Sequence, residues 1–262
     1  MHFAKSFLLL AALTTSTFAR PEGHERRQVA TATTTSAASS SSTSSGGTWT
    51  DTPSSGSYST SGFGGVTSSS GSGNTYTGNV GNPYGSNIIE VSASDASQYK
   101  YVMQFQGSNT VDWTVAIWNK YGPDGKMDGW FGNACKTFTL AAGATKYFAF
   151  DEDTNGGFAA AAGSIPTDSN GGYAATWGEF DFGSTVKNGW SGFDVSAIAA
   201  QNAGLSVQGL KICDALGNTC SSMTSGAGSV SNAYTKAETD VGGIGGNLPP
   251  GPVRLAVTLD WS

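Results

Sequence analysis

The segment Arg254-Leu255-Ala256-Val257-Thr258-Leu259-Asp260-Trp261 decides the fold class, because it alternates apolar and polar side chains more cleanly than any other stretch. Alternation with a period of two predicts a half-buried β-strand. The side chains expected to face the core are Leu255, Val257, Leu259 and Trp261, and those expected to face outward are Arg254, Ala256, Thr258 and Asp260.

Similar segments recur from Trp49 to the C-terminus, separated by turns rich in Gly, Asn, Asp and Pro. The clearest are Tyr99, Tyr101, Met103 and Phe105 along one strand, and Trp113, Val115 and Ile117 along the next. This spacing predicts an all-β fold, a single β-sandwich domain over residues 48–262. One short helix is expected from Ser196 to Asn202, with Ser196 as N-cap and Gly204 as its end; a loop is the alternative.

The first 47 residues have the composition of targeting and linker segments. Lys5 and the apolar run 7–13 predict a secretory signal peptide over 1–19. The dibasic Arg26-Arg27 predicts a pro-segment over 20–27, with an exposed charge pair as the alternative. Ser and Thr supply 12 of the 15 residues 31–45, which predicts a disordered, O-glycosylated linker over 28–47. We therefore expect a secreted protein, extracellular or associated with the cell wall, and no membrane span.

Charge and histidine content exclude several functions. The net charge of -6 argues against nucleic acid as a partner, since phosphate binding needs a basic face. Both histidines, His2 and His24, lie in the segments that are expected to be removed. The mature protein would then lack Ser-His-Asp catalysis and histidine-ligated metals, and we expect no cofactor. Any acid or base in an active site would be a carboxyl group.

Three cysteines remain in the mature chain. Cys213 and Cys220 flank a polar turn, so we expect a disulfide bond between adjacent strands. Cys135 is left over, and we interpret it as a buried small hydrophobe rather than a nucleophile, because no histidine is present to activate it.

Several long strings make the chain from about Trp49 onward resemble the fungal secreted allergens of the Asp f 4 type. The main ones are Gly62-Phe63-Gly64-Gly65, Trp118-Asn119-Lys120, Thr176-Trp177-Gly178-Glu179-Phe180-Asp181-Phe182 and Gly189-Trp190-Ser191-Gly192. The resemblance implies an extracellular protein that human IgE recognises.

The order of the segments also resembles, more weakly, that of thaumatin-like domains. Their Ala-Glu-Phe and Tyr-Asp-Val-Ser strings place a Glu and an Asp in an acidic cleft that binds, and in some members cleaves, β-1,3-glucan. The matching positions here are Glu179 and Asp194. The many cysteines of that family are missing, and no cleft arginine can be placed, since Arg254 is the one arginine of the mature chain.

Period-two geometry puts Trp177, Glu179 and Asp181 on one face of a strand and points Phe180 and Phe182 to the core. An indole beside two carboxylates suits a sugar, which stacks on the ring and hydrogen-bonds the acids. The alternative is a solvated outer face, which we favour for Asp181. Asp194 is interpreted either as an acid-base partner of Glu179 or as a carboxylate that caps the amides of Ser196 or Ala197.

Two further groups of residues are candidates for the same groove. Asp151, Asp153 and Asn155 match the first half of a calcium loop, but the second half fails, so an acidic loop that rims the groove is favoured over a metal site. Trp130 and Trp190 each lie beside a Gly, and they either line a carbohydrate surface or cover a core edge.

Three functions remain open. The favoured one is non-covalent binding of cell-wall β-glucan. The second is a glucan hydrolase in which Glu179 and Asp194 are catalytic. The third is a surface protein with no sugar site.

Overall fold

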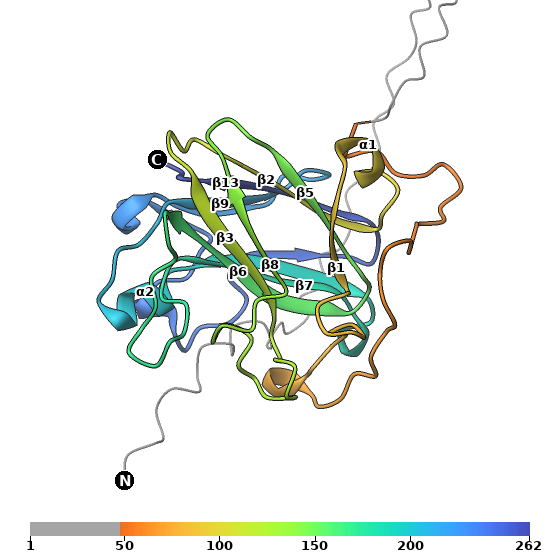
Figure 1. Cartoon of the computed structure of the whole chain (residues 1–262), viewed down its shortest axis with the longest axis horizontal. Coiled ribbons are helices and arrows are strands. Elements are labelled where there is room, and N and C mark those ends of the chain that lie inside the picture. The colour runs from red at the N-terminus through yellow and green to blue at the C-terminus, as the bar shows by residue number, and fades with distance from the viewer. Residues whose placement is uncertain (1–47) are drawn as a thin grey trace, which may run out of the picture.

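The computed structural model describes residues 48–262. The predicted signal peptide, pro-segment and linker lie outside these described residues. Two β-sheets pack face to face, as Figure 1 shows, with helices α1 (Ala93–Ala96) and α2 (Ile198–Ala203) at opposite ends of the sandwich. The prediction of an all-β sandwich is confirmed.

The first sheet has seven strands in the order β1-β5-β2-β13-β9-β10-β11. Their bounds are β1 Ile88–Val91, β2 Tyr101–Gly107, β5 Lys146–Phe150, β9 Leu210–Asp214, β10 Cys220–Met223, β11 Val230–Ser231 and β13 Val253–Leu259. Neighbours are antiparallel except β13 and β2, which run parallel.

The second sheet has six antiparallel strands in the order β12-β8-β7-β6-β3-β4. Their bounds are β3 Trp113–Asn119, β4 Lys136–Leu140, β6 Thr154–Ala162, β7 Trp177–Ser184, β8 Trp190–Ser196 and β12 Gly246–Leu248. Short 3-10 turns, η2 (Gly73–Thr75), η3 (Thr185–Lys187), η4 (Ser225–Ala227) and η5 (Lys236–Glu238), lie in the connections.

The main core fills the space between the two sheets. Each sheet contributes the inward half of its alternating strands, and the resulting buried cluster includes Met103, Phe105, Val115, Ile117, Phe180, Phe182, Leu255, Val257 and Leu259. The inward positions expected along these strands are therefore correct.

Two expectations at strand ends, for Trp261 and Tyr99, were wrong, and the one for Arg254 was correct in direction but not in exposure. Strand β13 ends at Leu259, so Trp261 lies outside the core, with the Lys211 Nζ atom 4.1 Å from its ring centroid. Tyr99 precedes β2 and packs against Phe63 in a separate cluster. Arg254 does point away from the core, but it is fully buried because residues 49–51 cover that face of the first sheet.

Helix α2 forms where it was expected, with a different start. Ala197 occupies the N-cap position and makes no side-chain cap, so the assignment of Ser196 as the cap was wrong by one residue. Gly204 ends the helix in the left-handed conformation, with φ 68°, which glycine adopts without steric cost. Among the described residues, no helix is both long and apolar enough for a membrane span.

The expected disulfide bond is present and joins Cys213 of β9 to Cys220 of β10, which face each other in the ladder. Cys135 is free and half-buried against the core, and burial raises the pKa of its thiol.

We predict that the double substitution Cys213→Ser and Cys220→Ser lowers the free energy of unfolding by about 2 kcal/mol, because the disulfide bond closes a short loop in the unfolded chain. Urea denaturation measures this. A reductant should destabilise the wild type to the same extent and leave the double variant unchanged.

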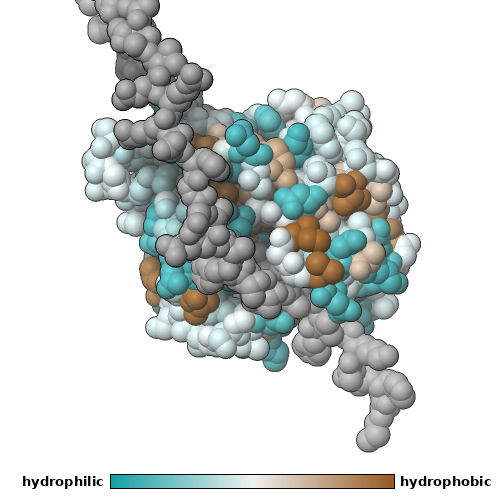
Figure 2. All heavy atoms as spheres, turned by 180° about the vertical axis from the view of Figure 1, so that it is seen from behind, coloured by the Kyte–Doolittle hydropathy of each residue, from teal (hydrophilic) through white to brown (hydrophobic). Residues whose placement is uncertain are grey.

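On the coloured part of the surface that Figure 2 shows, hydrophobic residues form small patches separated by polar side chains. Several loops contribute single exposed apolar residues, namely Val66, Val111, Phe131, Val186, Leu205, Leu216, Val230 and Val241. Such scattered apolar residues are normal on a protein surface.

Candidate functional site

Strand β7 positions the predicted site residues. Phe180 and Phe182 enter the core, as expected, and the alternate side chains Trp177, Glu179 and Asp181 therefore point to the outer face of the second sheet. Loops cover much of this face, so the three side chains lie beneath other segments of the chain rather than on an open surface.

A cavity of about 250 Å³, which we call the charged groove, opens over Glu179 and Asp181. Strands β6 and β7 and the connecting segments supply its lining, which consists of Ser72, Gly73, Tyr76, Lys120, Asn155, Gly156, Glu179, Phe180, Asp181, Val186 and Lys187. Two carboxyl groups and two ammonium groups meet here. The groove is therefore balanced in charge, whereas the sequence led us to expect an acidic one.

The carboxylates of the groove are buried. Glu179 is 4% exposed and Asp181 is 5% exposed, so the interpretation of Asp181 as a solvated residue was wrong. The reason is η3, which follows β7 and brings Lys187 back over the strand. The Lys187 Nζ atom lies 2.9 Å from Asp181 Oδ2.

Several buried polar atoms at this groove have no hydrogen-bond partner among residues 48–262. They are Asn155 Oδ1, Glu179 Oε1 and Asp181 Oδ1. Most buried polar atoms in folded proteins are paired, so each exception calls for an explanation. Three unpaired acceptors that belong to the lining of one cavity make it the candidate site for hydroxyl or amide donors.

Burial shifts the pKa values of two side chains in the groove, Glu179 and Lys120. It raises the pKa of Glu179 from 4.5 to about 7, although the nearby Lys120 opposes the shift. Burial also lowers the pKa of Lys120 to about 8, although Asp181 and Glu179 oppose that shift. Near neutral pH, Glu179 is thus close to its midpoint and can donate or accept a hydrogen bond.

Asp194 lies next to Glu179 but outside the groove. The two residues pair across β7 and β8, which places their Cβ atoms about 4.5–5.5 Å apart on the same face. Asp194 is fully buried, and Gly245 packs against its Cβ atom. Neither carboxylate oxygen has a hydrogen-bond partner in the part of the chain that the structure describes, so the alternative that Asp194 caps Ser196 or Ala197 was wrong. Burial, and then the neighbouring Glu179, raise its pKa well above the usual value.

Trp177 faces the same side as Glu179 but lines a different depression. This aromatic groove, of about 750 Å³, is lined by Trp130, Phe131, Thr167, Asp168, Ser169, Asn170, Tyr173, Ala174, Trp177, Ala199, Asn202, Ala203 and Leu205. Trp130 therefore lines a surface groove with its ring packed on Trp177. Trp190 is half-buried at the start of β8 and lines neither groove.

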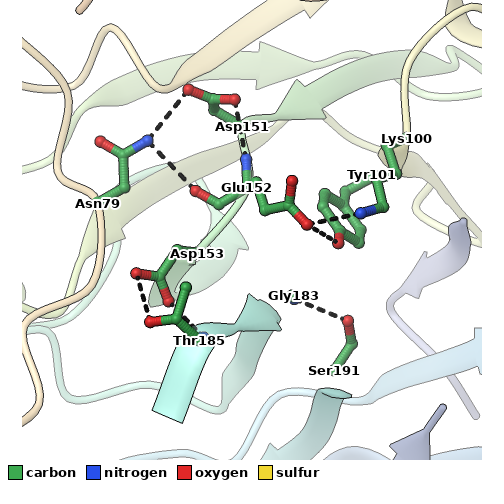
Figure 3. A network of polar contacts seen from close by, with 9 residues as sticks. All are labelled: Asn79, Lys100, Tyr101, Asp151, Glu152, Asp153, Gly183, Thr185 and Ser191. Atoms are coloured by element: carbon green, nitrogen blue, oxygen red, sulfur yellow. Dashed lines mark hydrogen bonds and ion pairs between the residues drawn. The ribbon is translucent and has the colours of Figure 1, made fainter. Parts of the chain in front are cut away.

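The acidic loop between β5 and β6 does not gather its side chains in one place, as Figure 3 shows for two of them. Asp151 accepts a hydrogen bond from Asn79, whereas Asp153 turns to the other side and accepts from Thr185 and from the buried hydroxyl of Tyr76. Asn155 points into the charged groove. The calcium-loop alternative is therefore not supported, and no group of three His, Cys, Asp or Glu residues within 48–262 is arranged to hold a metal.

Asp151 and Asp153 also fail to rim the charged groove, as had been expected. Asp151 lines a separate depression with Lys100 and Glu152, where the Lys100 Nζ atom lies 2.6 Å from Glu152 Oε1. Asp153 is buried, and it ties the loop to Tyr76 and η3.

Sequence reasoning missed three charged-groove residues, namely Tyr76, Lys120 and Lys187. Lys120 could have been predicted from the sequence, because the core positions Val115 and Ile117 imply that Trp118 and Lys120 face outward. Tyr76 and Lys187 lie in irregular segments whose periodicity gives no indication of their direction.

Comparisons with known proteins agree with the resemblance drawn from the sequence. A family model, described as the Allergen Asp f 4-like domain, matches residues 86–259. The chain is 53% identical over 214 residues to Allergen Asp f 4 of Aspergillus fumigatus, and the match covers 81% of this chain and 66% of that relative. Among solved structures, the protein elicitor MoHrip2 of Magnaporthe oryzae matches with a TM-score of 0.39 and 10% identity, over 61% of this chain and 98% of that one.

Proposed function

The chain belongs to the Asp f 4-like allergen family, and from that premise we propose that its native role is the non-covalent binding of cell-wall β-glucan through the charged groove. The observation that carries the proposal is the set of unpaired buried acceptors on Asn155, Glu179 and Asp181. Secretion, which the sequence predicts from its N-terminus, would bring the protein into contact with this polysaccharide.

The mixed lining of the groove suits a neutral ligand with many hydroxyl groups. Lys120, Lys187 and the Asn155 amide are donors, whereas Glu179 and Asp181 supply acceptors. A sugar hydroxyl both donates and accepts, so it can pair with either kind of group. An ionic ligand would leave some of the opposite charges of the groove unpaired, and an unpaired buried charge is costly.

We predict that Glu179→Gln and Lys120→Met each weaken binding to β-glucan by about tenfold. Each substitution keeps the approximate shape of the side chain and removes a charge-assisted hydrogen bond to the ligand, which contributes about 1.5–3 kcal/mol. Binding isotherms on insoluble β-glucan measure the effect. Glu90→Gln is the matched control, because Glu90 is an exposed carboxylate on β1 of the other sheet, paired with Lys146.

The outcomes separate the functions that the sequence left open. If neither the wild type nor the control variant binds β-glucan, the proposal is wrong and the surface protein without a sugar site is favoured. If the Glu179→Gln and Lys120→Met variants bind β-glucan as tightly as the wild type does, the ligand binds elsewhere on the domain.

A glucan hydrolase is the second candidate, and the raised pKa of Glu179 favours it, since a general acid needs a proton near neutral pH. Asp194 does not line the groove, so the second carboxyl group that could reach a ligand is Asp181, held by Lys187. Alternate residues on a strand lie about 7 Å apart, within the range of inverting hydrolases. Release of reducing ends by the wild type, and its loss in Glu179→Gln, would favour hydrolysis over binding.

Recognition by host IgE, which the family resemblance implies, is a separate proposal. It concerns the exposed surface of the domain and does not depend on the groove. The charged-groove variants should therefore bind serum IgE as the wild type does.

A further inference from the structure

The aromatic groove has the structure of a binding site that is prepared in advance. Trp177 forms its buried floor and donates a hydrogen bond from Nε1 to the Tyr173 carbonyl at 2.9 Å. The ring of Trp130 packs on Trp177 with centroids 5.6 Å apart and remains half exposed. Trp177 is only 2% exposed, so a ligand would meet the ring of Trp130, which Trp177 supports from below. A ring that is already held in place loses little entropy on binding.

The opposite walls of the groove carry small and polar residues. Ala199 and Ala203 of α2 leave space beside the rings, and Asn202 is exposed at the rim. The 167–170 loop is held by Asp168 Oδ1, which accepts from the backbone N–H groups of Asn170 and Gly172 at 2.8 and 3.0 Å. Because these two amides engage Asp168, they are not free to bind an anionic ligand.

Aromatic faces with amide and hydroxyl groups at the rim form the usual combination for a sugar ring. The ring stacks its C–H face on an indole, and its hydroxyls bond to the rim groups. An apolar peptide would use the rings but would leave Asn202, Asn170 and Ser169 without a role. The lining therefore favours carbohydrate over an apolar segment.

The two grooves lie over the same face of the second sheet. On β7, Trp177 and Glu179 are alternate residues that line the two grooves. Lys120 of the charged groove directly follows β3, and two residues earlier Trp118 packs on Trp177 and Tyr173 of the aromatic groove. The backbone distance from Trp177 to Asp181 is about 13 Å at the usual rise per residue. One extended ligand that runs along β7 could contact both grooves.

We propose that the aromatic groove is a second sugar subsite that extends the charged groove, so that the chain binds a neutral polysaccharide segment several sugar units long. This inference rests on the proposed function, which supplies the ligand of the first subsite. It adds a dependence on ligand length and a role for Trp130.

Calorimetric titration of the secreted protein with linear β-1,3-linked gluco-oligosaccharides of increasing length tests the inference. Affinity should rise with length until both grooves are filled. Trp130→Ala should weaken binding of the longer oligosaccharides by about tenfold and leave that of the shortest binder unchanged. Trp190→Ala is the matched control, because Trp190 is also half-buried and lines neither groove.

A second variant, Asn202→Ala, tests the same groove in case Trp130→Ala fails to fold, because Asn202 is exposed on α2 and its substitution removes no core packing. It should weaken binding of the same long oligosaccharides, to a smaller extent. As an independent readout, the indole N–H signal of Trp130 in NMR spectra should shift with long oligosaccharides and not with short ones.

The possible failures can be told apart. If oligosaccharides bind and Glu179→Gln weakens them, but neither length nor Trp130 matters, the second subsite is wrong and the proposed function stands. If no oligosaccharide of any length binds, both are wrong. If the Trp130 signal shifts with an apolar peptide and not with any oligosaccharide, the groove is a peptide site and the inference is overturned.

Discussion

The folded domain should lose about 3 kcal/mol of stability as the pH rises from 4.5 to about 7. The cause is Glu179, whose pKa is 4.5 in the unfolded chain and about 7 when buried in the fold. Folding therefore favours the protonated acid. Its contribution is fully present below pH 4.5 and is lost as the pH rises through the folded pKa.

Other buried ionisable groups near Glu179 also change how the stability of the domain depends on pH. Burial also raises the pKa values of Asp181 and Asp194, so their ionisation lowers stability in the same direction. Lys120 acts in a separate window, because its pKa falls from 10.5 to about 8 and the unfolded chain binds its proton more tightly. Stability should therefore rise again as the pH increases from about 8 to 10.5, which places the minimum near pH 7–8.

Urea denaturation across this pH range measures the effect. Glu179→Gln should reduce the fall between pH 4.5 and about 7, because the amide does not titrate, and should leave the part that is due to Asp181 and Asp194. Glu90→Gln, at an exposed position, should keep the wild-type profile. A wild-type stability that stays level or rises over this window would show that Glu179 is not desolvated as the fold implies.

The sequence predicted which face of a strand each residue occupies, and the second sheet follows that prediction. Phe180 and Phe182 enter the core and Glu179 and Asp181 turn away from it, because the period of two is a local property of the backbone. The burial of the outer face was not predictable in this way. It depends on segments distant in sequence, such as Tyr76, which reaches Asp153, and Gly245, which packs against Asp194.

The separation of the candidate residues into two grooves has the same origin. Trp177 and Glu179 are neighbours on β7, so the sequence suggested one site. Trp130 and Tyr173 pack around the indole and enclose it in a groove of its own. These contacts join loops whose lengths and directions no local pattern specifies.

Substitution of Arg254 by Met should lower the free energy of unfolding by about 3–5 kcal/mol. The guanidinium is fully buried on β13 and donates to the backbone carbonyls of five residues. These residues are Trp49, Asp51, Ser97, Lys100 and Val253. Within residues 48–262 it forms no salt bridge with a carboxylate, and burial lowers its pKa to about 10.

Two opposing effects determine the size of this loss. Removal of a buried charge without a counterion recovers desolvation energy, and a well-packed apolar replacement can be neutral when the partner is removed with it. Here the partners are main-chain carbonyls, which the substitution leaves in place without the guanidinium. The Lys100 carbonyl keeps the Val253 N–H as a donor, and each carbonyl left without any donor costs about 1–3 kcal/mol. Several orphaned carbonyls outweigh the recovered desolvation, so the net effect is destabilising.

The loss should begin where residues 49–51 meet the first sheet, because Arg254 joins that segment to β13 and to the end of α1 through Ser97. Hydrogen exchange should therefore show early loss of protection at Lys100 and Val253 in Arg254→Met. Lys236→Met is the control, since Lys236 is an exposed cation whose replacement should change stability by no more than about 0.5 kcal/mol. Equal stabilities for the two variants would mean that water replaces the guanidinium as donor, and that Arg254 does not hold the N-terminal segment in place.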